Sequence, residues 1–595
     1  MKRRIVALLL MFSMSASILA GCGTSDIENV SGSGHTRPGT GLLTTGVINA
    51  SDEDIEERIK EVGEAYDGLY SYDTQRSKSR GLLTTNNVVM YEAVAGADAV
   101  AEAEEDMSYA VAPDAVGDVV MPVDPYVDVD WNTENYNSVK ESGFVSVATQ
   151  PFSTFGADVD TATYSNFRRS VFQNDGYGIT GDAIRIEEMV NYFSYDYPEP
   201  KDGDKFSATT VLTPCPWNKD TLLLKVGIKA EEVEADKGSN IVFLIDTSGS
   251  MFDNNKLPLA QEAFKTLQEQ LTDKDTVSIV TYAGTSEVAL EGASGDEHKK
   301  IVKAIDGLEA YGSTNGEGGI KKAYEIAEKY FIEGGNNRIL LATDGDLNVG
   351  VSSEAGLIEL VEEKRETGVF LSCLGFGNGN YQDDKMEALA DHGNGNYSFI
   401  DCTREAERVL KDEFESTLFT VAKDVKFQVE FNPAQVKGYR LIGYENRKMA
   451  AEDFADDTKD GGEVGSGQTV TVLYEVVTTD SAYEIPEVTS KYGNSAAEGT
   501  DSDELLTVSI RYKEPDEDTS KLLTYPVGKD SITDTMDEDT SWAAGVAQFG
   551  MLLRDSDYKG TSDYDEIRER LKNTSKVMTD DFRAEFIYII DEVKP

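Results

Sequence analysis

The stretch IVFLIDTSGSM, from Ile241 to Met251, joins an apolar run to three oxygen-bearing side chains. Continuous apolar residues up to Ile245 are typical of a buried parallel strand. Asp246, Ser248 and Ser250 then follow at alternate positions. Carboxylates and hydroxyls are ligands of hard dications such as Mg²⁺ and Ca²⁺. The stretch therefore offers a strand that ends in a metal site, although a D-x-S-x-S motif on its own is most often a helix N-cap or a turn, where Asp and Ser are favoured for local backbone bonding.

Two more candidate ligands lie further along the chain. Thr314 lies in the glycine-rich stretch YGSTNGEGG, and Asp344 directly follows the apolar run of RILLATDGD. Open α/β sheets bind ligands beyond the carboxyl ends of their strands, near the point where the strand order reverses. Because Asp246 and Asp344 both close apolar runs, we expect all five side chains to converge at one edge of a sheet.

Helical and strand patterns alternate around these residues. Helical periodicity marks residues 256–271, 298–308, 320–330, 355–366 and 404–418, with a short helix from Lys385, and strands are expected at 276–282, 287–290, 338–343, 369–376 and 397–400. This alternation favours right-handed crossovers and a mostly parallel sheet with helices on both faces. The predicted fold class is α/β, with a doubly wound, Rossmann-like sheet.

Stretches typical of antiparallel strands flank this unit on both sides. They are residues 206–212 and 221–230 before it, and 425–431, 439–444, 469–477 and 505–512 after it. Strands on both sides predict one β-sandwich-like region into which the α/β unit is inserted. A helical pattern from Ser541 to Gly560 adds C-terminal helices.

The D-x-S-x-S motif, together with Thr314 and Asp344, resembles the metal-ion-dependent adhesion site of von Willebrand factor type A domains. The resemblance implies that Asp246, Ser248, Ser250, Thr314 and Asp344 hold a divalent cation, with Mg²⁺ preferred and Ca²⁺ or Mn²⁺ as alternatives. The segments FGADVDTATYSNFRR, IRIEEMVNYF and SWAAGVAQFGMLLRDSDYKG also resemble the companion domains of a family of bacterial lipoproteins with a type A domain.

The first companion segment contains two further carboxylates, Asp158 and Asp160, which could also bind a metal. The pattern instead favours the capped start of a helix. In that interpretation, Arg168 or Arg169 pairs with an acidic residue such as Glu187 or Glu188.

The N-terminus predicts export and lipidation. Three basic residues at positions 2–4 precede an apolar stretch, 5–18, that is too short to span a membrane. The sequence Leu19-Ala20-Gly21-Cys22 resembles the lipobox of bacterial lipoproteins. This resemblance implies removal of residues 1–21, diacylation of Cys22 and anchoring to the membrane. The expected location is extracytoplasmic, at the cell surface or the periplasmic face.

The sequence thus predicts five segments. They are a signal peptide at 1–21, an acidic low-complexity stalk at 22–145 with one helical patch at 53–70, an N-terminal companion domain with flanking strands at 146–236, the type A domain at 237–418, and a β-rich and helical companion domain at 419–595. Cys215, Cys373 and Cys402 match no metal spacing, and we expect buried free thiols, with pairing of Cys373 and Cys402 as the alternative.

The composition of the chain excludes several classes of function. The formal net charge is −54, from 109 acidic and 55 basic residues, which argues against nucleic acid as a partner. With only three histidines, no H-E-x-x-H motif can be written, and the chain has no phosphate-binding loop, so we expect no enzyme. The predicted function is capture of a protein ligand's acidic side chain through the metal. The alternatives are assembly of a membrane complex and a metal-dependent hydrolase.

Overall fold

The computed structural model describes residues 50–84, 134–136, 140–157, 160–173, 181–233, 237–345, 347, 354–485, 499–500, 502–515 and 517–595. All of them belong to one compact unit, residues 50–595. The predicted signal peptide, with Cys22, and most of the predicted stalk lie outside the described residues.

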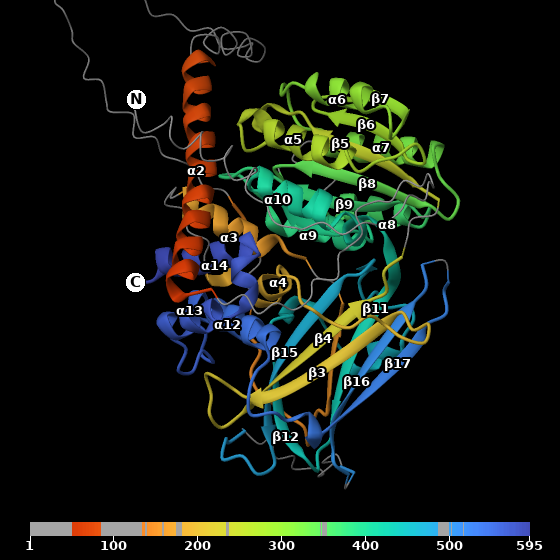
Figure 1. The fold of residues 1–595 in the computed structure, drawn as a ribbon. Coiled ribbons are helices and arrows are strands. Elements are labelled where there is room, and N and C mark those ends of the chain that lie inside the picture. The colour runs from red at the N-terminus through yellow and green to blue at the C-terminus, as the bar shows by residue number, and fades with distance from the viewer. Residues whose placement is uncertain are drawn as a thin grey trace, which may run out of the picture. The chain divides into compact units, whose positions relative to one another are not determined.

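The predicted α/β unit contains a six-stranded sheet with the order β10-β9-β8-β5-β6-β7 (Figure 1). Its strands are β5 (Ser239–Asp246), β6 (Thr276–Tyr282), β7 (Ser286–Ser294), β8 (Asn336–Thr343), β9 (Phe370–Gly375) and β10 (Tyr397–Phe399). All neighbours are parallel except β6 and β7. The doubly wound, mostly parallel sheet is therefore confirmed, and its strand order reverses between β5 and β8.

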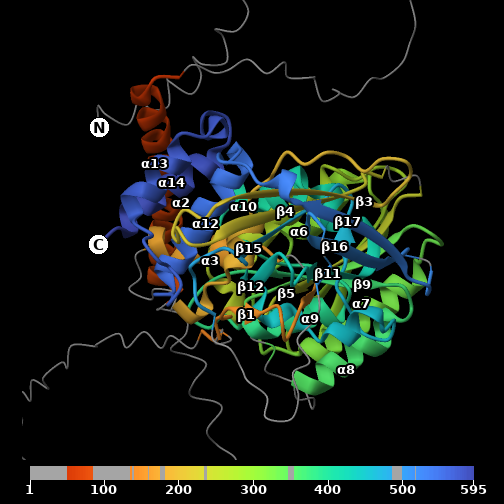
Figure 2. The same cartoon turned by 90° about the horizontal axis from the view of Figure 1, so that it is seen from below.

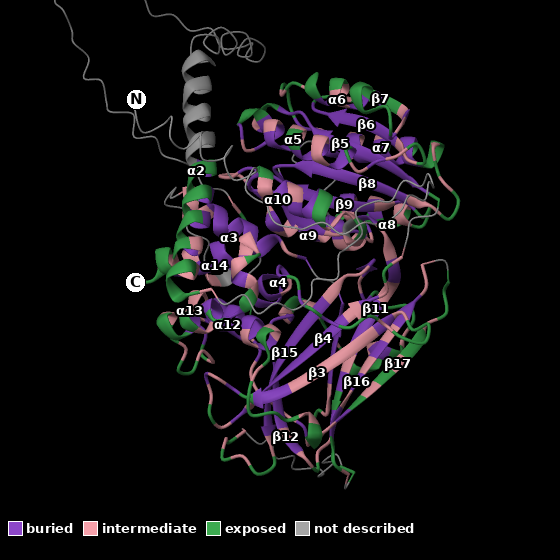
Figure 3. Ribbon diagram, viewed as in Figure 1, coloured by how far each residue is buried: buried purple, intermediate pink, exposed green. Residues whose placement is uncertain are grey.

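Helices cover both faces of this sheet. They are α5 (Leu257–Gln268), α6 (His298–Asp306), α7 (Gly316–Lys329), α8 (Glu354–Arg365), α9 (Asp383–His392), α10 (Thr403–Glu407) and α11 (Phe414–Leu418). One hydrophobic cluster includes Phe264 of α5 and Ile305 of α6, and another includes Ile320 of α7 and Val361 of α8. With both faces covered, β5 and β8 are buried along almost their whole length (Figure 3).

The helix expected at 404–418 is not continuous. A π-helical turn, η5 (Arg408–Asp412), separates α10 from α11. Within it, the backbone amide of Glu413 donates to the carbonyl of Arg408, five residues earlier, at 2.8 Å. The Arg408 guanidinium also pairs with Glu405 and Glu413, at 2.6 and 2.8 Å. Ion pairs on both sides of Arg408 support a turn that the 3.6-residue periodicity does not predict.

The flanking strands form two antiparallel sheets, with the orders β1-β12-β15-β4-β3 and β13-β2-β11-β16-β17, and β14 beside β11. The strands are β1 (Val145–Ser146), β2 (Phe152–Gly156), β3 (Phe206–Pro214), β4 (Leu222–Ala230), β11 (Thr420–Phe431), β12 (Val436–Ile442), β13 (Lys448–Met449), β14 (Val464–Gly465), β15 (Thr469–Thr478), β16 (Glu504–Lys513) and β17 (Lys521–Gly528). Buried residues of both sheets share one core, including Val226, Val472, Phe427 and Ile510.

Each sheet combines strands from both sides of the α/β unit. Strand β4, which precedes the unit, pairs with β15, which follows it, and Val226 lies opposite Val472. Strand β2 pairs with β11 in the same way, with Phe155 opposite Phe427. The α/β unit is therefore inserted between strands of a single sandwich.

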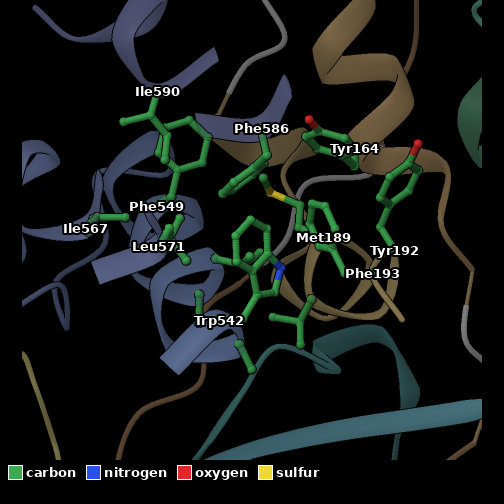
Figure 4. Close-up of a cluster of buried hydrophobic side chains, with 14 of the residues drawn as sticks. Tyr164, Met189, Tyr192, Phe193, Trp542, Phe549, Ile567, Leu571, Phe586 and Ile590 are labelled. Atoms are coloured by element: carbon green, nitrogen blue, oxygen red, sulfur yellow. The ribbon is translucent and has the colours of Figure 1, made fainter. Parts of the chain in front are cut away.

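A third region is helical. It contains α2 (Asp52–Thr84), α3 (Ala162–Gln173), α4 (Ile186–Asn191), α12 (Glu538–Leu553), α13 (Tyr564–Lys572) and α14 (Asp581–Val593). Figure 4 shows its core, in which Trp542 and Phe586 of the C-terminal helices lie against Met189 and Phe193. Short 3-10 turns connect the elements of the chain: η3 (Gly181–Ala183), η4 (Gly249–Phe252), η6 (Glu445–Arg447), η7 (Ala451–Ala455), η8 (Lys529–Ser531) and η9 (Ser575–Met578).

Helix α2 differs from a simple stalk. It contacts α14, and the two lie side by side in Figure 1 and Figure 2. Ile59, Val62 and Tyr66, spaced three and four residues apart, are buried in the core of the helical region. This apolar face explains why part of the segment expected as a stalk packs against the C-terminal helices.

Arg168 on α3 connects the helical region to the α/β unit. It is fully buried and pairs with Asp401 at 2.6 Å and with Glu405 at 2.7 Å. The structure therefore gives Arg168 long-range partners instead of the expected Glu187 or Glu188. Its neighbour Arg169 pairs with Glu134 at 3.0 Å.

The cysteine prediction is confirmed. Cys215, Cys373 and Cys402 are all buried free thiols. Burial also raises the pKa of the Cys215 thiol to about 12, so it is inert as a nucleophile at neutral pH.

The shared sandwich predicts how fragments of the chain behave. Residues 419–595 alone should not fold, because β15 would lose β4 and β11 would lose β2, exposing the apolar faces of both sheets. Co-expression with residues 140–233 should restore folding, and residues 237–418 should fold alone as the control because they contain the whole central sheet. Circular dichroism and limited proteolysis would measure this. A stable fragment beginning near Phe419 would contradict the shared sandwich.

Candidate metal centre

The ends of two adjacent strands position the predicted aspartates. Strand β5 ends at Asp246, and Asp344 directly follows the end of β8. Both aspartates are fully buried, and Oγ1 of Thr343 donates to Oδ2 of Asp246 at 2.9 Å. Since the strand order reverses between β5 and β8, the two carboxylates lie in the crevice where sheets of this class bind ligands.

The turn after β5 brings three predicted ligands together. The backbone amide of Ser248 donates to Oδ1 of Asp246 at 2.8 Å, and the hydroxyl oxygens of Ser248 and Ser250 are 3.0 Å apart. Ser248 also precedes the 3-10 turn η4, but within this described turn its side chain makes no capping hydrogen bond. Ser248 is therefore not a capping residue, while the bond from its amide to Asp246 is a local turn of the kind that the sequence also allowed.

Thr314 reaches the same edge through its loop. The amide of Gly249 donates to the carbonyl of Gly312 at 3.0 Å, and the amide of Tyr311 donates to the carbonyl of Thr247 at 2.8 Å. These two bonds attach the loop before α7 to the turn after β5. Thr314 lies two residues beyond Gly312 and is 7% exposed. All five predicted side chains therefore lie on segments that meet at one edge.

Two residues at this edge were not predicted. Nζ of Lys256 donates to Oδ2 of Asp344 at 2.9 Å, and Nδ2 of Asn380 donates to the same oxygen at 3.1 Å. Lys256 immediately precedes α5. A cation at the N-terminal end of a helix opposes the helix dipole, so it indicates a nearby negative charge. That signal in the sequence could have drawn attention to Lys256.

The donors fit a hard dication. Burial raises the pKa of the Asp246 carboxyl to about 6; the charge of Asp344 contributes to this rise, while hydrogen bonds from Ser248 and Thr343 oppose it. A nearby cation would stabilise the ionised form of this desolvated carboxylate. The five donors are all oxygens, the set that Mg²⁺, Ca²⁺ and Mn²⁺ prefer, and include no thiolate or imidazole.

A second acidic group lies elsewhere. Ligand atoms of Asp160, Glu188 and Glu387 are within 4.8 Å of one another and could hold a metal. Arg185 already donates to Glu188 and Glu387, at 3.1 and 2.8 Å, and Arg447 to Asp160 and Glu387, both at 3.0 Å. Backbone amides bind the remaining oxygens of Asp160 and Glu188. An ion would have to displace two guanidinium groups, so this group serves better as an ion-pair network.

The central sheet and its oxygen-rich edge define a protein with a von Willebrand factor type A domain. Three family patterns match along the chain: "von Willebrand factor" at residues 130–225, "von Willebrand factor type A domain" at 240–413 and "Uncharacterized protein YfbK, C-terminal" at 416–595. The chain is 42% identical over 469 residues to "Uncharacterized protein YfbK" of Escherichia coli K12, covering 77% of this chain and 81% of that protein. The chain therefore belongs to the YfbK family.

Other relatives match shorter stretches. "Uncharacterized protein sll0103" of Synechocystis is 26% identical over 200 residues, which cover 34% of this chain and 46% of that protein. A solved structure, "von Willebrand factor type A from Catenulispora acidiphila", is 14% identical with a TM-score of 0.37, and covers 64% of this chain and 91% of that one. The family match confirms the predicted type A domain with companion regions on both sides.

The two acidic groups can be distinguished by counting bound ions. We expect a Mn²⁺ titration, followed by calorimetry and metal analysis, to find one ion per chain. Glu387→Gln should leave that number unchanged, because the carboxylates of its group already accept hydrogen bonds from arginines, but should lower the melting temperature. Two ions per chain, with one lost in Glu387→Gln, would identify the second group as a metal site.

Proposed function

We propose that this protein is a non-enzymatic binding protein that captures an acidic side chain of a protein partner at the edge formed by Asp246 and Asp344. The observation that carries the proposal is the pair of hydroxyls of Ser248 and Ser250, 3.0 Å apart beside the buried Asp246. Their chemistry suits a divalent cation, with Mg²⁺ preferred and Ca²⁺ or Mn²⁺ as alternatives.

The mixture of donors favours binding of an anion. Ser248, Ser250 and Thr314 offer neutral oxygens, so only Asp246 and Asp344 add negative charge, directly or through water. When bound, the dication supplies an electrophilic centre whose roughly six-coordinate shell a carboxylate can complete. The −54 net charge is spread over the chain, and beyond about 8 Å it is largely screened at physiological salt.

The surface beside these ligands suits a protein partner. Phe252 and Tyr311, close in sequence to Ser250 and Thr314, are 42% and 58% exposed. A groove of about 680 Å³ begins at Phe252, and residues including Met251, Leu257, Leu308 and Ala310 also line it. Exposed aromatic residues are enriched at protein interfaces. A partner's acidic residue at the metal would therefore bring neighbouring apolar residues of the partner against this surface.

The metal is tested with Asp246→Ala. Mg²⁺ should stabilise the wild-type chain by about 2.7 kcal/mol at roughly a hundredfold excess over its dissociation constant. Asp246→Ala should lose this stabilisation, because it removes charge from the centre of the site. Thr314→Ala removes only a neutral donor, so it should weaken binding less. Thermal unfolding with and without Mg²⁺ measures the effect.

Asp253→Ala is the matched control, because Asp253 lies just beyond the same turn but is exposed. It should keep the full response to Mg²⁺.

A chelator and Asp246→Ala should each abolish capture of partners from intact cells. Equal thermal shifts in wild type and Asp246→Ala would remove the basis of the proposed function.

We further propose that the protein is a lipoprotein held on the extracytoplasmic side of the cell membrane. Support comes from the apolar stretch at 5–18 and the lipobox ending at Cys22. Among the described residues, no helix combines the length and apolar character needed to cross a bilayer. Two acyl chains on Cys22 would give stable anchoring where one chain gives marginal binding.

Replacement of Cys22 tests the anchor. Cys22→Ala should leave the signal uncleaved at that bond and the protein without lipid, because the acyl acceptor is gone. Labelling with radioactive fatty acid and partitioning into detergent measure this, and Ser25→Ala, just beyond the lipobox, is the control. Normal lipid labelling of Cys22→Ala would contradict the proposal.

A further inference from the structure

We infer that Lys256 is a built-in counterion that weakens metal binding at this site and leaves a bound metal more attractive to a partner's carboxylate. The inference rests on the proposed function, because it concerns the same five ligands. It adds a residue that does not itself bind the ion but sets the charge of the site.

The structure holds the Lys256 ammonium firmly beside the candidate ligands. Its Nζ lies 2.9 Å from Oδ2 of Asp344 and 2.8 Å from Oδ1 of Asn380. The lysine side chain is only 5% exposed, and Asp344 is fully buried. An ion pair removed from solvent in this way is screened far less by salt than a surface pair.

The loop between β9 and α9 fits around this side chain. Gly377 has a φ of +86°, and a Cβ at that position would collide with the Lys256 stem. Asn380, three residues later, uses its carbonyl oxygen for Lys256 and its amide nitrogen for Asp344. Glycine thus allows the loop to enclose the stem, while asparagine orients the ammonium toward the carboxylate.

The net charge of the site determines how Lys256 affects metal binding. Asp246 and Asp344 supply two negative charges when ionised, and Lys256 supplies one positive charge. A dication among these three groups makes the site positive overall, whereas without the lysine charge the site would be neutral. The lysine therefore repels the incoming metal but favours binding of an anion to it, as expected for charges interacting in a poorly screened site.

A purely structural role for Lys256 predicts the opposite effect on metal affinity. If Lys256 only supported the loop, its removal would loosen Asp344 and weaken metal binding. If it acts as a counterion, its removal should strengthen metal binding. The direction of the change in metal affinity therefore distinguishes the counterion role of Lys256 from a purely structural role.

The experiment measures Mg²⁺ and Mn²⁺ dissociation constants of the full chain by calorimetry. Lys256→Gln should bind either ion more tightly, by about tenfold. Lys256→Arg, which keeps the charge, should stay close to wild type. The control is Lys265→Gln on α5, the helix that Lys256 precedes, because Lys265 pairs with Glu262 and Asp306 near the surface. It should leave the affinity unchanged.

The outcomes separate the inference from the proposed function. Unchanged or weaker binding in Lys256→Gln, with wild type binding Mg²⁺ and Asp246→Ala not binding it, would overturn the counterion role and leave the metal site intact. If wild type binds neither ion, the proposed function fails, and the inference fails with it. If Lys256→Gln does not fold, Lys256→Met decides, because methionine keeps a long unbranched apolar side chain and removes the charge. It should tighten binding by a similar factor. Unchanged or weaker binding in Lys256→Met would then overturn the inference.

Discussion

Two buried carboxylates at the point where the strand order reverses are the constraint on which the rest of the site depends. Asp246 and Asp344 lie at the ends of adjacent parallel strands, and neither is exposed to solvent. Burying unpaired negative charge costs several kcal/mol per ion. The fold offsets this cost with hydrogen bonds from Ser248 and Thr343 to Asp246 and with the ammonium of Lys256 at Asp344. The surrounding loops are placed so that these donors reach the two aspartates.

The N-terminal companion region contributes to this arrangement. The loop after β9, which carries Asn380 to Asp344, is held from outside the type A domain. The amide of Gly379 donates to Oε1 of Glu134 at 2.7 Å, and Glu134 in turn pairs with Arg169 of α3. Asn378 of the same loop donates to Gln173, at the end of α3, at 3.0 Å. One wall of the candidate site is thus fixed by residues that precede the type A domain and lie 205 and 245 positions before the loop residues they hold.

The shared sandwich explains how such contacts are maintained. Because β2 and β4 pair with strands that follow the type A domain, the chain leaves and re-enters the same double sheet around that domain. The buried Arg168 adds a second connection, from α3 to Asp401 and Glu405. Removing one partner of such a buried pair leaves an uncompensated charge, which costs about 3–5 kcal/mol, so this connection is hard to break.

The local pattern of apolar and polar residues was enough to predict most of the helices and strands of the central sheet and the sandwich. Apolar runs and alternating stretches located β5, β8 and most strands of the sandwich, and the D-x-S-x-S spacing located Asp246, Ser248 and Ser250 on one turn. These features depend on residues near one another in sequence, where the period of apolar residues follows directly from strand and helix geometry. Once a parallel sheet was assumed, the point where its strand order reverses predicted that Asp344 would lie beside Asp246.

Only the tertiary structure decided which distant residues meet. It placed Lys256 and Asn380 at Asp344, gave Arg168 its partners Asp401 and Glu405, and packed α2 against α14. A buried charge selects its partner by position in space, and residues far apart in sequence leave no local periodicity that reveals their contact. The sequence by itself therefore determined the sheet and the ligand-bearing turn, whereas packing between distant segments decided the charge around them.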